Sequence, residues 1–474
     1  MITLADVIEA LTQSRPEMPS LAITEAAIDS RQAVAGALFI AIPGEKVDGH
    51  DYVAQAFQRG AIAALIEHPL DQPFTVLDLR NGLPAEGLSQ LFAPVCLLVQ
   101  NTVTALQQIA TFWRARLGNL RVVGITGSVG KSTSKEAIAS VLSQRYVTLK
   151  STANLNNEIG LPLNVLRLTT KHQYAVLEMG FYVPGEIAQL CEIARPQIGL
   201  LTNIGTVHAE RAGSQEAIAL GKGELVEALP PAPGGIAILR YDDPLIRPMK
   251  SRTKAKVFYY GTSPAADLWA GSVESLGLEG VRFRLSYKNE TVPLQIPMIG
   301  RHSVETAMCA AAVGLVEGLS WDEIIRGLQE NTTPLRLVAT HTENGALVLD
   351  DTYNASPEST LAALDLLGDL PGRRIAVLGD MLELGQYEQA GHQSVGVRAA
   401  QVADILLTLG PRAHIIAESA AQAGMKRAAI HEYDEIGSVS DWLKQNLGAG
   451  DVALIKGSHG LRMDQIIATL ELTR

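Results

Sequence analysis

TGSVGKST, residues 126–133, decides the fold of the middle of this chain. It follows the apolar segment RVVGIT and precedes TSKEAIASVLSQ, whose apolar residues recur at helical spacing. Glycines let the backbone turn tightly and direct N–H groups at phosphate oxygens, and the start of the next helix adds a partial positive charge. Lys131 can reach the β- and γ-phosphates of a nucleotide, and the Ser132 hydroxyl can ligate Mg²⁺. The stretch predicts a strand, a phosphate loop and a helix, with nucleotide contacts from Gly127, Ser128, Gly130, Lys131, Ser132 and Thr133.

The loop is one residue shorter than the pattern GxxxxGK[ST] requires. Ile125 stands where that pattern has its first glycine, and Gly124 is the nearer glycine. Kinases, transport ATPases and ligases all use loops of this kind, so the loop alone predicts nucleotide binding and leaves the reaction open.

Outward from the loop, short apolar segments alternate with helical ones. YAVLEM and IGLLTNI read as strands with the helical segment GEIAQLCEIA between them, which is typical of a parallel sheet covered by helices. Residues 230–300 are richer in short strands and read as an edge of the same unit. A mixed α/β unit precedes this region, and a Rossmann-like α/β unit with strands such as RIAVLG and DVALIKG follows it. We therefore expect an α/β protein of three domains, residues 1–113, 114–334 and 335–474.

The overall composition agrees with this expectation and excludes some functions. A chain of 474 residues holds three domains at roughly 150 residues each. The formal net charge of -11 disfavours binding to nucleic acid or to anionic membranes. The cysteines Cys96, Cys191 and Cys309 are far apart and form no CxxC pair, which fits a reducing compartment. We expect a cytoplasmic, monomeric protein with no signal peptide and no membrane insertion.

The order of the motifs along the chain resembles the Mur ligases. After the loop come NLNNEIGLPLNVL, LEMGFYVPGEIAQL, TNIGTVHAE, ALGKGEL, GRHSVETAMCAAA, PLRL, DDTYNASPES, AVLGDMLELG and LIKGSHG. In the first domain, IDSR at 28–31 and ALFIAIPGEKVDGHDY at 37–52 resemble the UDP-binding domain of the branch that adds D-alanyl-D-alanine to a UDP-muramoyl tripeptide. Each motif is weak by itself, whereas the ordered set covers nearly the whole chain.

This resemblance implies a reaction that joins a carboxylate to an amine. A substrate carboxylate attacks the γ-phosphate of ATP to form an acyl phosphate, and the amine of D-alanyl-D-alanine then displaces phosphate. The protein mainly positions the reactants and neutralises charge. The resemblance also implies two Mg²⁺ ions.

The resemblance assigns catalytic and metal-binding roles to a few residues. Lys131, Lys222, His208 and Arg336 are the predicted catalytic residues, and Arg336 would pair with the γ-phosphate. Metal ligands are predicted to be Ser132, Glu178, His208 and Lys222. In this family Lys222 corresponds to a lysine that carries a carbamate, which turns a cation into an anionic oxygen ligand. Without the resemblance, Lys222 would be interpreted as a surface helix lysine.

Further contacts follow from the same resemblance. Asp351 and Tyr353 are the expected ribose and adenine contacts, and Lys456 with Ser458 would face the incoming amine. Asn156 and Asn157 would line the acceptor channel. The UDP end is predicted at Ser30, Arg31, Asp48, Gly49 and His50.

Six residues depart from the usual family pattern. Val129 and Arg240 replace asparagines, and Ser132 replaces a threonine but keeps the hydroxyl. Ser303 and Thr306 replace asparagines near the adenine, and His459 replaces an arginine. Three alternatives stay open: a sister ligase that adds another amino acid or peptide, a nucleotide-binding regulator without catalysis, and an unrelated ATPase coupled to transport or movement. The intact Lys131, Glu178 and Lys222 oppose the regulator, and the DDTYNASP domain opposes the unrelated ATPase.

Overall fold

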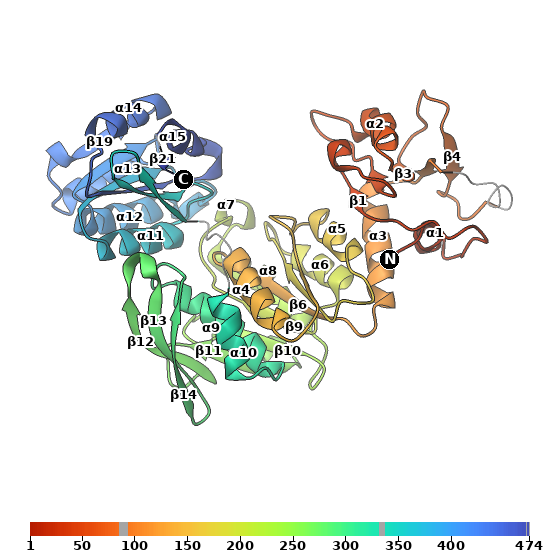
Figure 1. Ribbon diagram of the computed structural model, residues 1–474, viewed down its shortest axis with the longest axis horizontal. Coiled ribbons are helices and arrows are strands. Elements are labelled where there is room, and N and C mark those ends of the chain that lie inside the picture. Colours follow the sequence, from red (N-terminus) through yellow and green to blue (C-terminus); the bar gives the residue numbers. More distant parts are fainter. Residues whose placement is uncertain (85–92, 331–336, 471, 474) are drawn as a thin grey trace.

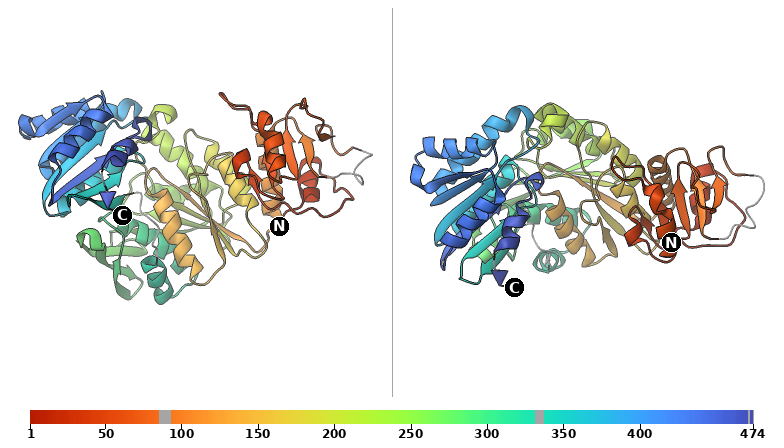
Figure 2. Two further views of the ribbon diagram at one scale, coloured as in Figure 1. Left: turned by 45° about the horizontal axis from the view of Figure 1, so that its top comes forward. Right: turned by 90° about the horizontal axis from the view of Figure 1, so that it is seen from above.

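The computed structural model describes residues 1–84, 93–330, 337–470 and 472–473. Three sheets follow one another along these described parts of the chain. The first and third sheets lie at opposite ends of the molecule with the central sheet between them, as the three views show (Figures 1 and 2). The prediction of an α/β protein with three domains is confirmed.

The first sheet is small and entirely parallel. Its strands lie in the order β1 (Ala26–Ala27), β2 (Leu38–Ile40), β3 (Ala63–Ile66), β5 (Val95–Leu98) and β4 (Thr75–Asp78). Apolar residues fill β2, β3 and β5, and all of them are buried. A parallel sheet is covered on both faces, so its strands carry such unbroken apolar runs. The accompanying helices are α1 (Leu4–Thr12) and α2 (Val53–Gln58).

Helix α3 (Thr102–Arg116) connects the first sheet to the central one. It packs against α1 on one side and against α5 (Gly160–Leu166) and α6 (Glu186–Ala194) on the other. Arg114, near its end, is buried and donates to the carbonyl oxygens of Ala194, Leu117, Leu120 and Arg195. The predicted boundary at residue 113 falls inside this helix, which has contacts in both neighbouring units.

The central sheet is parallel in its core and antiparallel at one edge. Its order is β14 (Glu290–Ile296), β13 (Val281–Tyr287), β12 (Leu268–Ser275), β11 (Lys256–Gly261), β10 (Ile236–Arg240), β9 (Ile198–Leu201), β6 (Arg121–Thr126), β8 (Tyr174–Glu178) and β7 (Thr148–Lys150). Only the pairs β12–β13 and β13–β14 are antiparallel among these described strands. This antiparallel edge falls within the region predicted to be rich in short strands.

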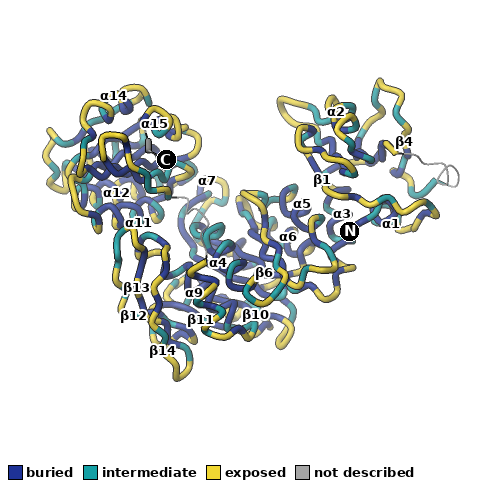
Figure 3. The backbone as a smooth tube through the Cα atoms, in the orientation of Figure 1, coloured by how far each residue is buried: buried dark blue, intermediate teal, exposed yellow. Residues whose placement is uncertain are grey.

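Helices cover both faces of the central sheet. Along β6, Val122 belongs to one apolar cluster and Val123 and Ile125 to the other, as the alternation of a strand requires. One face carries α4 (Lys131–Ser143), α9 (Ser303–Val316) and α10 (Trp321–Gln329). The opposite face carries α3, α5, α6 and α8 (Gln215–Glu227), with the short α7 (Ala209–Ala212) beside α8. Buried strands between exposed loops are visible in Figure 3.

The third sheet is also mostly parallel. Its order is β19 (Ile430–Tyr433), β18 (Ile405–Leu409), β17 (Arg373–Gly379), β20 (Asp451–Lys456), β16 (Leu347–Asp351), β15 (Val338–Thr342) and β21 (Leu472–Thr473). Its helices are α11 (Pro357–Asp369), α12 (Glu388–Val402), α13 (His414–Gln422), α14 (Ile436–Asn446) and α15 (Asp464–Thr469). In the part of the chain that the structure describes, no helix is both long and apolar enough to cross a membrane.

Candidate active site

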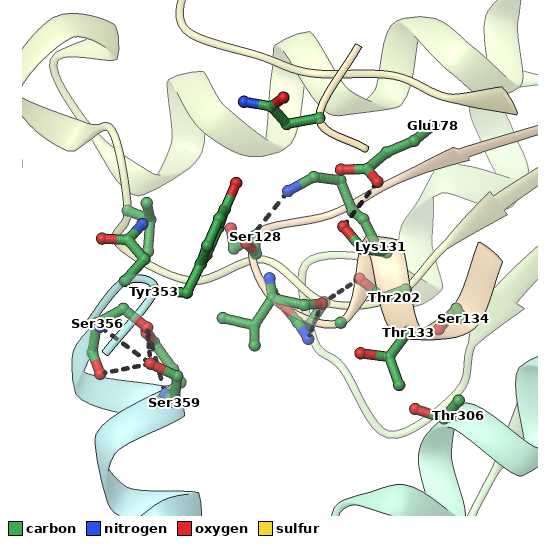
Figure 4. A pocket seen from close by; sticks show the side chains of 18 of the residues that line it. Ser128, Lys131, Thr133, Ser134, Glu178, Thr202, Thr306, Tyr353, Ser356 and Ser359 are labelled. Carbon is green, nitrogen blue, oxygen red and sulfur yellow. Dashed lines mark hydrogen bonds between the residues drawn. The ribbon is translucent and has the colours of Figure 1, made fainter. Parts of the chain in front are cut away.

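A cavity of about 720 Å³ lies between the central and third domains. Its central-domain wall is formed where β6, β8 and β10 end, and ligands of α/β sheets bind at the carboxyl ends of strands. From the third domain, Tyr353 and the start of α11 face the phosphate loop across the cavity (Figure 4). Ile28 reaches it from the first domain. Residues from all three domains therefore meet in one space.

The phosphate loop is held in shape by the segment after β9. Gly127 has φ 148°, and a Cβ there would lie 1.9 Å from Thr202 Oγ1, so only glycine fits. The Val129 N–H donates to Asn203 Oδ1, and the Val129 carbonyl oxygen accepts from Thr202 and Asn203. These bonds involve the backbone of Val129, so the loss of the usual asparagine side chain leaves the loop geometry intact.

Lys131 is the first residue of α4 and lines the cavity. Its Nζ donates to the carbonyl oxygens of Gly127 at 2.8 Å and Ser128 at 3.3 Å, so the side chain folds back over the loop (Figure 4). A cation in this position stands beside the N–H groups of the loop, where phosphate oxygens bind.

Ser132, Glu178 and Asn156 form one hydrogen-bonded group. Ser132 Oγ donates to Glu178 Oε2 at 2.7 Å, and Asn156 Nδ2 donates to Glu178 Oε1 at 2.9 Å. Glu178 ends β8 and is buried. A hydroxyl next to a buried carboxylate is an oxygen donor set of the kind that Mg²⁺ prefers, so these residues fit the metal that the motif implies.

Lys222 lies in the middle of α8 and is buried, with 1% of its surface exposed. Its Nζ donates to the Gly127 carbonyl oxygen at 3.1 Å and lies 4.7 Å from the centre of the Phe181 ring. Burial, and secondly the positive charge of Lys131, lower the pKa of Lys222 well below its usual value. The alternative interpretation as an exposed helix lysine is therefore wrong.

His208 stands at the start of α7 and contacts the third domain. Its Nδ1 lies 2.6 Å from Glu383 Oε2, and its ring packs edge-on against Tyr182. Burial lowers the pKa of His208, with Glu383 opposing this shift and the cations Lys131 and Lys222 adding to it. His208 lines the cavity together with Lys131 and Ser132.

The third domain contributes to the cavity wall an ion pair between a buried lysine and a half-buried aspartate. Lys456 Nζ lies 2.7 Å from Asp351 Oδ2 and donates to the carbonyl oxygen of Asn354. The pair forms because β16 and β20 are parallel neighbours with Asp351 opposite Lys456. Tyr353 lies in the following loop and lines the cavity beside them.

Two of the departures from the family pattern, Arg240 and Thr306, line another part of the wall. Arg240 ends β10 and pairs with Glu305 on α9, with Nη1 2.8 Å from Oε2. Burial raises the pKa of Glu305, and Arg240 counteracts the shift. Thr306 also lines the cavity, whereas the Ser303 hydroxyl donates to the Ile299 carbonyl oxygen.

The residues predicted for the UDP end lie in the first domain and do not line the cavity. Ser30 is buried and donates to Gln55, whereas Arg31 is exposed and pairs with Asp29. His50 bonds Asp48 through Nδ1 and the Glu67 N–H through Nε2. Asp48, His50 and His68 have ligand atoms close enough for a metal ion, but both His50 nitrogens already serve these bonds. Gly49 packs against the backbone of Ile42.

The other predicted residues are divided between the cavity and its surroundings. Asn157 lines the cavity. Ser458 is buried and accepts from the Leu382 N–H instead of lining the cavity. His459 packs near the Tyr353 ring. Arg336 lies outside the described residues.

Several residues that matter to the site were missed in the sequence. Thr202 and Asn203 hold the phosphate loop, and their place directly after an apolar strand was an available signal. Glu383 and Glu358 approach from the third domain, where the Glu358 carboxylate accepts from the Thr206 N–H at 3.2 Å. No local pattern pointed to these two contacts.

Three family models match the chain. "Mur ligase middle domain" matches residues 125–314, "Mur ligase, glutamate ligase domain" matches residues 335–459, and "Mur ligase family, catalytic domain" matches residues 22–94. The matched segments cover more than half of the chain and contain the phosphate loop, Glu178, Lys222 and Asp351.

Similar proteins match over nearly their full length. A UDP-N-acetylmuramoyl-tripeptide–D-alanyl-D-alanine ligase of Bacillus subtilis is 36% identical over 464 residues, which are 97% of this chain and 95% of that protein. The Escherichia coli ligase of the same name is 33% identical, with 94% and 92% covered.

Solved structures agree with these matches. A crystal structure of MurF from Acinetobacter baumannii superposes with a TM-score of 0.83 at 28% identity, covering 98% of this chain and 97% of that one. MurF ligase from Thermotoga maritima, solved in complex with ADP, superposes with a TM-score of 0.78 at 27% identity, covering 96% and 98%.

Proposed function

The chain belongs to the Mur ligase family, and from this premise we propose that it joins D-alanyl-D-alanine to UDP-N-acetylmuramoyl tripeptide in peptidoglycan precursor synthesis. Ligases of this family form an amide bond at the expense of ATP, so the chain is an ATP-dependent ligase. The full-length similarity to ligases with this named activity is the observation that carries the proposal.

The wall of the cavity supplies the groups that the reaction needs. Lys131 and the N–H groups of the loop would hold the phosphates of ATP, with Gly127, Ser128, Gly130, Ser132 and Thr133 around them. Mg²⁺ neutralises phosphate charge when it is bound, and Ser132 and Glu178 are the residues that would hold it, with His208 nearby. Arg336 stays a prediction for the γ-phosphate.

Substrates approach the phosphate loop from two sides. Asn156 and Asn157 line the side toward the first domain, where Ser30, Arg31, Asp48, Gly49 and His50 would bind the UDP end of the tripeptide substrate. Asp351, Tyr353 and Lys456 line the opposite side, where the nucleoside and the D-alanyl-D-alanine amine would lie. Ser458 supports this wall through its bond to Leu382.

We infer that Lys222 carries a carbamate in the active enzyme. A neutral amine reacts with CO₂, and burial of Lys222 favours the neutral form. The amine nitrogen forms a bond to the CO₂ carbon and releases one proton to solvent, so the product is a carbamate anion that would supply oxygen ligands to a second Mg²⁺.

The remaining predictions concern the whole chain. The division into three units at 1–113, 114–334 and 335–474 is supported by the positions of the three sheets, whereas residue 113 lies within α3 and residue 334 lies outside the described residues. A cytoplasmic location is supported by three buried, unpaired cysteines. The monomeric state stays a prediction.

Phosphate release tests the proposed activity. We expect ATP turnover to require both UDP-muramoyl tripeptide and D-alanyl-D-alanine, because the acyl phosphate needs its amine acceptor. A panel of other D,D-dipeptides, L,L-dipeptides and single amino acids distinguishes a sister ligase. Equal turnover with neither substrate present would refute ligation, and no turnover with any pair would favour a regulator.

A further inference from the structure

Two residues with left-handed backbone conformations bond to each other across a domain boundary. Among the described residues, eight non-glycine residues have positive φ, and two of them are His208 at 69° and Glu383 at 64°. Their side chains meet with His208 Nδ1 2.6 Å from Glu383 Oε2. Non-glycine residues in this region carry backbone strain, and such residues cluster at functional sites.

The backbones of the two segments are in direct contact at this point. The Glu210 N–H donates to the Glu383 carbonyl oxygen at 3.2 Å. Gly385 opens the 3-10 helix Gly385–Tyr387, and a Cβ at this position would lie 2.9 Å from Glu210 Cα. A glycine is thus needed for the third domain to dock this closely against α7, which lies beside that domain in Figure 1.

The His208 imidazole is fixed from several directions. The Tyr182 ring packs edge-on against it with 4.9 Å between ring centres, and the Arg211 guanidinium lies 4.7 Å from the centre of the Tyr182 ring. Arg211 also approaches the second Glu383 oxygen at 3.9 Å. The Glu383 carboxylate is therefore oriented as well as the imidazole that it contacts.

The direction of the hydrogen bond has a chemical consequence. An ionised carboxylate only accepts hydrogen bonds, so His208 Nδ1 must be the donor, and Nε2 keeps its lone pair in the neutral imidazole. Histidines that hold a cation commonly donate their other ring N–H to a carboxylate, which fixes the ring and its tautomer. His208 lines the cavity with Lys131 and Ser132, so its orientation matters at the phosphate site.

We propose that Glu383 is a positioning residue that orients His208 toward the phosphate site, and that it does so only while the third domain is docked. Glu383 belongs to the third domain and His208 to the central domain, so the active arrangement exists only in the docked state. This inference rests on the proposed function, because it assumes that His208 acts at the phosphate site of a ligase.

Steady-state kinetics of Glu383→Gln and Glu383→Ala test the proposal. We expect kcat to fall roughly 10–100-fold, the usual effect of losing a carboxylate behind a functional histidine, with the KM for ATP nearly unchanged. Glu432→Gln is the matched control, since Glu432 Oε2 lies 2.6 Å from His414 Nδ1 in a pair contained within the third domain. That variant should keep wild-type kcat.

Histidine-selective ¹⁵N NMR reads the tautomer directly, and the His208→Gln spectrum assigns the signal. We expect an Nδ1–H tautomer for His208 in the wild type and its loss in Glu383→Ala. An unchanged tautomer, or wild-type kcat in both Glu383 variants, would overturn the proposal. An inactive wild type would instead refute the proposed function, and the NMR result would still stand.

A double-mutant cycle separates positioning from a purely structural role. If Glu383 acts through His208, then the variant with both Glu383→Ala and His208→Ala should lose no more kcat than His208→Ala alone. If the kcat loss of the double variant equals the product of the two single-variant losses, then Glu383 acts independently of His208, which contradicts the proposal. Thermal unfolding of each variant checks that the kcat values compared are those of folded proteins.

Discussion

Lys222 Nζ donates to the carbonyl oxygen of Gly127 at 3.1 Å, so this lysine of α8 holds the backbone of the phosphate loop directly. Only 1% of Lys222 is exposed, and burial holds its pKa well below the usual value. Desolvation and the nearby charge of Lys131 both disfavour the charged form of this amine. Both the hydrogen bond and the burial make this lysine sensitive to substitution.

Lys222→Ala should therefore be nearly inactive. It removes the proposed carbamate, and two Mg²⁺ ions beside ATP need anionic oxygen ligands. Added formate or acetate should partly restore turnover by taking the place of the carbamate. Turnover with and without these anions is the measurement, and thermal unfolding checks the fold.

Lys222→Arg distinguishes the carbamate from the hydrogen bond. A guanidinium keeps its charge and cannot take up CO₂, so this variant should stay inactive. Wild-type turnover of Lys222→Arg would show that the carbamate is not needed. Lys150→Arg is a suitable control, since Lys150 is exposed at the end of β7.

Lys131→Ala should lower kcat by roughly 10²–10³-fold, the typical cost of one lost electrostatic contact to the transition state. Lys131 lines the cavity at the start of α4 and can follow charge onto the transferring phosphoryl group. Turnover at saturating substrates is the measurement. Activity within about threefold of wild type would mean that this loop is not the catalytic one.

Much of the fold was predictable because its signals are local. Apolar strands such as RVVGIT, the glycines of the loop and the helical spacing that follows all act within a few residues. Lys131 and Ser132 could be placed at a phosphate site for the same reason. The antiparallel pairing of β13 with β14 needed the structure, since strand neighbours depend on the whole chain.

The rest of the site depends on contacts between distant residues. Asp351 meets Lys456 only because β16 and β20 are neighbours in the sheet. Glu383 reaches His208 only when two domains dock. The burial of Lys222 could not be predicted either. Polar and apolar residues are mixed along α8, and Lys222 is buried because α8 packs against the phosphate loop.

Arg114→Met should destabilise the protein without touching the cavity. Methionine keeps much of the volume but donates no hydrogen bond, so the carbonyl oxygens of Ala194 and Leu120 would lose the Arg114 donor, whereas Leu117 keeps the Leu120 N–H. Each unsatisfied buried group costs about 1–3 kcal/mol, so we expect a loss of roughly 3–5 kcal/mol. The measurement is the free energy of unfolding in denaturant, with one probe placed on α3 and a second in the central domain.

Arg59→Met is the control for this prediction. Arg59 is exposed at the end of α2, where a surface change typically alters stability by less than about 0.5 kcal/mol. Equal stability of the Arg59 and Arg114 variants would show that the carbonyl contacts of Arg114 do not stabilise the junction between the first and central domains.

Glu178→Gln should raise the Mg²⁺ concentration needed for half-maximal activity. The glutamine keeps the shape of the side chain and can still accept from Ser132, which now donates to Glu178 at 2.7 Å. It removes the negative charge, and Mg²⁺ binds carboxylate oxygens in preference to neutral ones. A tenfold rise corresponds to about 1.4 kcal/mol of lost cation binding, and we expect at least this much.

The measurement is a titration of activity with Mg²⁺ at saturating ATP. Calorimetry of Mg²⁺ binding with a non-hydrolysable ATP analogue accompanies it. Glu192→Gln serves as the control, because Glu192 is exposed on α6. An unchanged Mg²⁺ requirement in Glu178→Gln would mean that the buried carboxylate only anchors Ser132 and Asn156, and the metal would then have to be held by other groups in the cavity.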